Sequence, residues 1–104
     1  MKYPNAWIER AYFDDRPARR FDDARVEIEA RTIVVEWRDG DQTVRYQGAR
    51  NGQGHFLLHG EDHQDNATLH RFEHSVILEG FWKHHGDSGF WRVHLPETSA
   101  PRSL

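Results

Sequence analysis

The stretch from Ser75 to Leu95, SVILEGFWKHHGDSGFWRVHL, constrains the fold more than any other part of the chain. It contains two apolar runs separated by a turn rich in Gly, Asp and Ser, and each run carries a Gly-Phe-Trp triplet. Apolar and aromatic runs of this length on either side of a Gly-containing turn are typical of a β-hairpin. Because aromatic rings this large are normally buried, we expect a sheet with a hydrophobic face.

Shorter signals of the same kind precede the hairpin. Residues 25–29 alternate strictly between apolar and charged side chains, which is typical of a half-buried strand. The parity shifts at residues 30–32, which predicts a tight turn or a β-bulge. Asp39-Gly40 and residues 51–54 are further turn signals. We therefore expect about eight short strands joined by short turns.

Hairpin-length links make an up-and-down antiparallel meander the simplest topology for these strands. Eight short strands can close into a barrel, which removes exposed edges and leaves an interior that side chains fill or that holds one small ligand. The sequence thus predicts a single all-β barrel domain over residues 1–95, followed by a flexible tail at 96–104. Residues 1–5 are expected to be loose. Residues 6–13 fit helical spacing but are rich in β-forming side chains, so both interpretations stay open, with strand preferred.

The segment from residue 14 to residue 23 predicts a loop, because Pro17 interrupts any regular element. It contains Arg16, Arg19 and Arg20 between two pairs of aspartates. The arginines could bind phosphate, or the cluster could neutralise itself in solvent. The second interpretation is preferred, because acidic and basic residues are balanced over this short stretch.

Period-two alternation assigns one side of each strand to the barrel interior. This interior set is Val26, Ile28, Ile33, Val35, Trp37, Val44, Tyr46, Phe56, Leu58, Ala67, Leu69, Val76, Leu78, Trp82, Trp91, Val93 and Leu95. Gly80 has the same parity, and a missing side chain there makes room for a neighbouring ring or for a ligand. Arg71 also has the interior parity: it either binds an anionic or carboxylate ligand or forms a salt bridge with a carboxylate at the barrel end.

The large rings of this set either fill the core or surround a mostly apolar pocket at the barrel mouth. In the second case the candidate ligand-binding residues are Trp37, Tyr46, Arg71, Trp82 and Trp91.

The outer face of the last four strands is less polar than a solvated face should be. The positions of these strands that alternation directs outward carry a mixture of aromatic, aliphatic and histidine side chains. Contiguous apolar surface on a soluble protein often marks an interaction site. We therefore expect a homodimer formed through this face, unless the N-terminal segment or the tail covers it. The candidate interface residues are Leu57, His70, Phe72, Ile77, Phe81, Phe90 and His94.

Composition narrows the partners and the compartment. The net charge is −3 with acidic and basic residues interspersed, which argues against nucleic acid and anionic membranes as partners. The chain has no cysteine, and it has no apolar run that could serve as a signal peptide or a membrane span. These features predict a soluble, cytoplasmic protein.

Signals for catalysis and metal binding are weak. Without cysteine and without a Gly-x-Ser-x-Gly motif, no nucleophile is recognisable, so a binding protein is favoured over an enzyme. His55 and His59 lie four residues apart, but four residues on a strand span about 13 Å, too far for one ion. A pair across strands, such as His55 or His59 with His70, stays open. His84 and His85 lie in the hairpin turn. No catalytic residue, metal or cofactor is assigned. A small-molecule-binding barrel is the first hypothesis, and a self-associating interaction module is the second.

Five short motifs lie along the expected strands: Trp7 with Tyr12, Tyr46-x-Gly48, ATLH at 67–70, Glu79-Gly80-x-Trp82 and Gly89-x-Trp91. In this pattern the chain resembles the avidin-like and lipocalin-like (calycin-type) β-barrels, and small bacterial barrels of unassigned function. The resemblance implies the barrel and a pocket for a small ligand, and it names no ligand.

Overall fold

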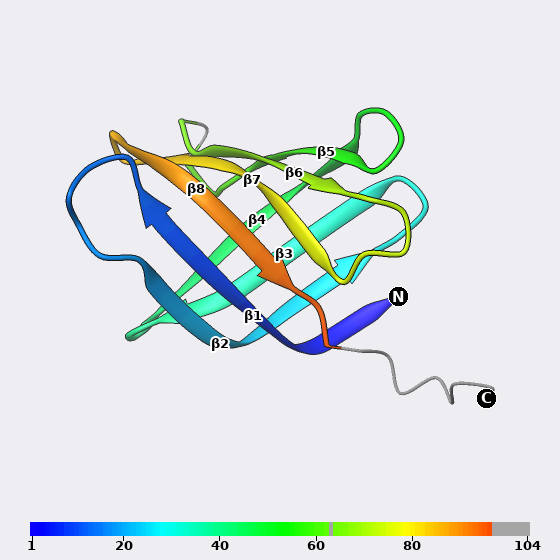
Figure 1. The fold of residues 1–104 in the computed structure, drawn as a ribbon, viewed down its shortest axis with the longest axis horizontal. Coiled ribbons are helices and arrows are strands. Elements are labelled where there is room, and N and C mark those ends of the chain that lie inside the picture. The colour runs from blue at the N-terminus through cyan, green and yellow to red at the C-terminus, as the bar shows by residue number, and fades with distance from the viewer. Residues whose placement is uncertain (63, 97–104) are drawn as a thin grey trace.

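The computed structural model describes residues 1–62 and 64–96, so residues 97–104 of the expected tail lie outside the described residues. Each strand pairs with its neighbours in sequence, and the first also pairs with the last, which closes an antiparallel barrel (Figure 1). The strands are β1 (Lys2–Tyr12), β2 (Arg19–Ile28), β3 (Thr32–Asp39), β4 (Gln42–Arg50), β5 (His55–His59), β6 (Asn66–Arg71), β7 (Ile77–His84) and β8 (Asp87–His94). The predicted all-β, up-and-down barrel is confirmed. A helix long and apolar enough to span a membrane is absent from residues 1–62 and 64–96.

Two of the hairpins have two-residue loops. Gly40 opens the β3–β4 loop with a φ of 65°, in the left-handed region that glycine adopts without strain. Both residues of the β7–β8 loop, His85 and Gly86, have positive φ, 48° and 82°, which is the pattern of a type I′ turn. Residues other than glycine are uncommon there, because a Cβ crowds the backbone. The expected turn at residues 30–32 is also present, between β2 and β3.

The two Gly-Phe-Trp triplets face each other across the β7–β8 hairpin. Gly80 pairs with Trp91, and Trp82 pairs with Gly89, so each tryptophan lies opposite a glycine. The Trp91 indole N–H donates to the carbonyl of Thr68 on β6 at 3.0 Å, so its ring crosses β7 at Gly80. A Cβ at Gly80 would overlap the same Thr68 carbonyl. The space at Gly80 therefore accommodates a neighbouring ring, one of the two uses that the sequence predicted.

Most of the barrel interior is formed by side chains that alternation assigned to it, but five buried core residues of β1 and β2 were not assigned: Tyr3, Ala6, Ile8, Phe21 and Ala24. Ile28 and Val44 are only partly buried against this core. The assignment of Val76 is wrong: it is 40% exposed, because β7 begins at Ile77 and the alternation does not extend to Val76. The predicted residues that are buried are Val26, Ile33, Val35, Trp37, Tyr46, Phe56, Leu58, Ala67, Leu69, Leu78, Trp82, Trp91, Val93 and Leu95.

The N-terminal segment is a long strand rather than a loose end. Strand β1 begins at Lys2, so the expectation for residues 1–5 is wrong, and the preferred strand interpretation of residues 6–13 is confirmed. The Met1 ammonium donates to the Ile28 carbonyl at 2.9 Å, and Tyr3 is buried. Pairing with β2 therefore orders these residues, which no pattern within the segment itself indicates.

The expected loop at 14–23 is shorter than predicted, since β2 begins at Arg19. Its arginines all lie beside carboxylates: Arg16 pairs with Asp14 and Asp87, Arg19 with Asp39, and Arg20 with Asp22. This pairing confirms that the basic cluster neutralises itself.

Candidate functional site

Four of the five predicted ligand-binding residues lie together in the barrel interior. Trp37, Tyr46, Trp82 and Trp91 are each at most 1% exposed. The rings of Trp37, Tyr46 and Trp91 contact one another, with centroids 5.6 to 6.0 Å apart. Because these rings pack against one another, they occupy interior space that the sequence left open to a ligand.

Arg71, the fifth candidate, lies apart from these rings. It ends β6, at the barrel end opposite the β7–β8 turn. Its Nε–H donates to the Ser75 carbonyl at 2.8 Å, and its backbone N–H donates to the Gly54 carbonyl at 2.7 Å. Arg71 thus joins two loops, and the structure does not bring it to the aromatic cluster.

A different arginine lies in the interior. Arg10 on β1 is 5% exposed and follows the buried Ala6 and Ile8 at alternate positions. Its guanidinium carbon lies 3.8 Å from the centroid of the Trp82 ring and 5.7 Å from that of Trp37. A desolvated cation gains about 2 kcal/mol from an aromatic face in this position. Burial nevertheless lowers the pKa of Arg10 from its usual value, because the charged form is removed from water.

At Arg10 and Trp37, two buried hydrogen-bond donors lack an acceptor among the described residues. In the part of the chain that the structure describes, neither Nε of Arg10 nor Nε1 of Trp37 has a hydrogen-bond partner, although both atoms are buried. The charge of the Asp39 carboxylate favours the charged form of Arg10, but this carboxylate accepts a hydrogen bond from Arg19 at 3.0 Å. Both orphaned atoms are donors, and buried donors are normally paired. The matching partner is therefore an acceptor, and beside an arginine the best acceptor is an anion.

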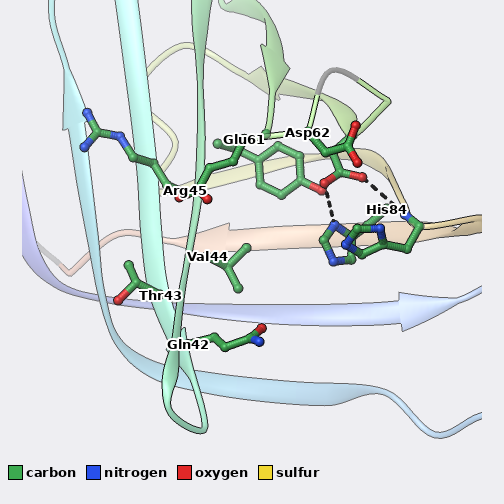
Figure 2. A pocket seen from close by; sticks show the side chains of 11 residues that line it. Gln42, Thr43, Val44, Arg45, Glu61, Asp62 and His84 are labelled. Atoms are coloured by element: carbon green, nitrogen blue, oxygen red, sulfur yellow. Dashed lines mark hydrogen bonds and ion pairs between the residues drawn. The ribbon is translucent and has the colours of Figure 1, made fainter.

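A pocket of about 490 Å³ opens at the barrel end where β1 and β7 finish. Strand β5 pairs with residues 47–50 of β4, so the first half of β4 extends beyond it and forms one wall. Figure 2 shows His84 across the pocket from Val44, with Glu61 and Asp62 in the loop that follows β5. Pockets for small molecules commonly have this size. We call this cavity the mouth pocket.

Tyr46 connects the mouth pocket with the interior around Arg10. Its side chain lines the pocket, and its hydroxyl donates to the Lys83 carbonyl at 3.3 Å. Burial raises the pKa of Tyr46 to about 12, and the charge of Arg10 partly opposes this rise. The phenol therefore stays neutral near pH 7 and can donate or accept a hydrogen bond.

The rim of the mouth pocket combines one carboxylate with two imidazoles. Asp65 is 4% exposed, and its Oδ1 accepts a hydrogen bond from the backbone N–H of His85 at 3.2 Å. Its Oδ2 lies 2.9 Å from Nδ1 of His84, a buried atom that has no hydrogen-bond geometry to any described residue. One ligand atom from each of the three side chains lies within 4.8 Å of the other two. Such a group could hold a metal ion.

The predicted interface residues divide into covered and exposed positions. His94 stacks on Trp7, with 3.6 Å between ring centroids, and its Nε2 lies 2.7 Å from a Glu9 oxygen, so β1 covers it. His70, Ile77 and Phe90 are half-buried, whereas the exposed members are Leu57, Phe72 and Phe81. Self-association through this face stays a prediction.

Sequence reasoning missed Arg10 and Asp65. Arg10 has the parity of Ile8 within residues 6–13, so extending the assignment of faces to that strand would have found it. Asp65 lies in the polar loop before β6, and its approach to His84 depends on how β6 and β7 pair, which no local pattern indicates.

The barrel is consistent with a calycin-like architecture, as the resemblance implied. No protein-family model matches this chain, and comparisons with curated proteins and with solved structures also found no match.

Proposed function

We propose that this protein binds a small molecule that carries an anionic group, and that Arg10 pairs with this group. The burial of Arg10 without an acceptor for its Nε carries the proposal. An unpaired charge removed from water costs several kcal/mol, so buried charges are normally paired. A carboxylate of the ligand would supply the missing charge. It would also accept a hydrogen bond from the orphaned donors of Arg10 and Trp37.

The mouth pocket supports the proposal, because it offers room beside Tyr46 for the body of such a ligand. Its lining is acidic on balance, since Glu61, Asp62 and Asp65 outnumber the one arginine there, Arg45. A ligand with only negative charge would be repelled there. We therefore expect an anionic group on a body that also carries hydrogen-bond donors or a positive charge, as a zwitterion does.

Thermal-shift screening with tryptophan fluorescence as a second readout tests this function. The panel contains small carboxylates, phosphate esters and zwitterionic amino acids. A ligand that reaches Arg10 should change the emission of Trp82, because the guanidinium carbon is 3.8 Å from its ring centroid. Arg10→Met removes the charge from the interior, and Arg71→Met removes an arginine from the opposite end.

We expect the ligand to raise the Tm of the wild type and of Arg71→Met but not that of Arg10→Met. A ligand that stabilises Arg10→Met as strongly as the wild type would contradict the role of Arg10.

A further inference from the structure

We propose that Asp65, His84 and His85 bind a divalent transition-metal ion of the Zn²⁺ class at the rim of the mouth pocket. The site is separate from Arg10, and the proposal does not depend on the ligand that Arg10 binds. Three observations support it: the donor set, the burial of Asp65, and the orientation of His84 relative to Asp65.

The donor set is the one that zinc prefers. Imidazole nitrogen and carboxylate oxygen are common protein ligands of Zn²⁺, whereas Mg²⁺ and Ca²⁺ prefer oxygen alone. Ligand atoms in a tetrahedral zinc site lie about 3.4 Å apart, as bond lengths near 2.1 Å require. Asp65 Oδ2 and His84 Nδ1 are already 2.9 Å apart, and all three candidate atoms lie within 4.8 Å of one another. His85 is exposed, so its side chain can rotate to close the remaining distance.

The burial of Asp65 favours a cation at this place. The residue is 4% exposed, and among the described residues its ion-pair partner is His84, which is charged only when protonated. The backbone N–H of His85 donates to Oδ1 and leaves Oδ2 directed at the imidazole. A buried carboxylate normally has a cationic partner or coordinates a metal.

The orientation of His84 relative to Asp65 fits shared coordination better than a hydrogen bond. Nδ1 is buried and only 2.9 Å from Oδ2, but the two atoms do not have the geometry of donor and acceptor. Without that hydrogen bond, Nδ1 of the neutral imidazole and Oδ2 each keep a lone pair that can bind an ion. Three protein ligands would leave one position for water or for a molecule in the mouth pocket.

The turn that carries His85 provides a variant that separates metal binding from folding. His85 occupies the first position of the type I′ turn, with a φ of 48°. Asn-Gly is the preferred sequence of such a turn, so His85→Asn should fold at least as well as the wild type while losing one ligand. His74 is the matched control, because its φ of 66° lies in the same left-handed region and its side chain is 90% exposed.

The experiment is isothermal titration of the full chain, dialysed against EDTA and then against buffer, with ZnCl₂. Titration with CoCl₂ adds visible absorption as a readout of tetrahedral coordination. We expect one ion per chain in the wild type and in His74→Asn. In His85→Asn and Asp65→Asn we expect affinity to fall by more than about tenfold, since even outer-sphere changes weaken metal sites by 10–100-fold.

The Tm of metal-free His85→Asn shows that this variant is folded, and Arg10→Met should keep the wild-type affinity for zinc. Absence of saturable binding in the wild type would overturn the proposal. Unchanged affinity in a folded His85→Asn variant would overturn it as well.

Discussion

Replacing Arg10 with methionine should make the ligand-free protein more stable while it abolishes ligand binding. The side chain lies at 5% exposure between the rings of Trp82 and Trp37. Methionine is unbranched and flexible, so it can follow much of the same path between these rings without carrying a charge. The variant therefore tests whether the charge of Arg10 serves the fold or a ligand.

Two opposing contributions set the expected size of the change. Losing the contact with the Trp82 ring at 3.8 Å costs about 2 kcal/mol. Removing a desolvated charge recovers a penalty of several kcal/mol, and replacing buried charges by apolar side chains can stabilise a protein by about 1–4 kcal/mol. We therefore expect the free energy of unfolding to rise by about 1 kcal/mol or more, which corresponds to a Tm increase of about 4–8 °C in a domain of this size.

Urea denaturation followed by tryptophan fluorescence measures this difference. Arg71→Met is the control, because it loses the hydrogen bond to the Ser75 carbonyl and should be less stable than the wild type by about 1 kcal/mol. If Arg10→Met unfolds with a free energy more than about 2 kcal/mol below that of the wild type, the stacking contribution dominates. Arg10 would then be a structural residue, and the reasoning that assigns it to a ligand would be refuted.

Four further predictions concern the fold, its dependence on pH and its assembly. Gly80→Ala should lower the free energy of unfolding in urea by more than about 3 kcal/mol, because its Cβ would overlap a carbonyl of β6; wild-type stability would contradict the described packing. Hydrogen bonds from Arg16 lower the pKa of Asp14 and of Asp87, so these contacts stabilise the fold fully only above the usual aspartate pKa of about 3.9. The difference in Tm between the wild type and Arg16→Gln should therefore shrink as the pH falls below about 4. Burial raises the pKa of Tyr46 to about 12, so this phenol ionises at lower pH in the unfolded chain than in the folded protein. The free energy of unfolding should therefore fall above pH ~10, and it should fall less steeply in Tyr46→Phe than in the wild type. Light scattering should give the mass of two chains, and a smaller mass for Phe81→Ser; the mass of one chain for the wild type would contradict self-association.

The strands and most of the core follow from the sequence, because both depend on local rules. In the β7–β8 hairpin, alternation predicts the inward tryptophans and turn chemistry predicts the hairpin, and the structure adds the register that places each tryptophan opposite a glycine. Val76 shows the limit of alternation, since it lies just before β7 and is exposed although it has the interior parity. The expectation of loose residues at the start of β1 is wrong for a different reason. These residues are ordered by pairing with β2, and no pattern within the segment itself indicates that pairing.

The candidate site depends on contacts between distant segments, so less of it could be predicted. An inward arginine suited to an anion was expected, but Arg71 lies at the wrong end of the barrel and Arg10 has the interior position. The sequence places His84 in the hairpin turn, whereas it is the last residue of β7, and its neighbour Asp65 directly precedes β6. Such proximity is set by strand register and barrel closure, and neither is encoded within a window of a few residues.

Closure of the barrel also has a kinetic consequence. Pairings between consecutive strands join residues that are close in sequence, whereas the β1–β8 pairing joins residues as distant as Trp7 and His94 (Figure 1). Contacts between distant residues form slowly, because the chain entropy lost on closing a long loop is not compensated until they form. During refolding, β1 and β8 should therefore remain open edges after the local hairpins exist, and open edges can pair with other chains. Weakening the Trp7–His94 stack should thus increase aggregation during refolding more than it lowers the stability of the finished barrel.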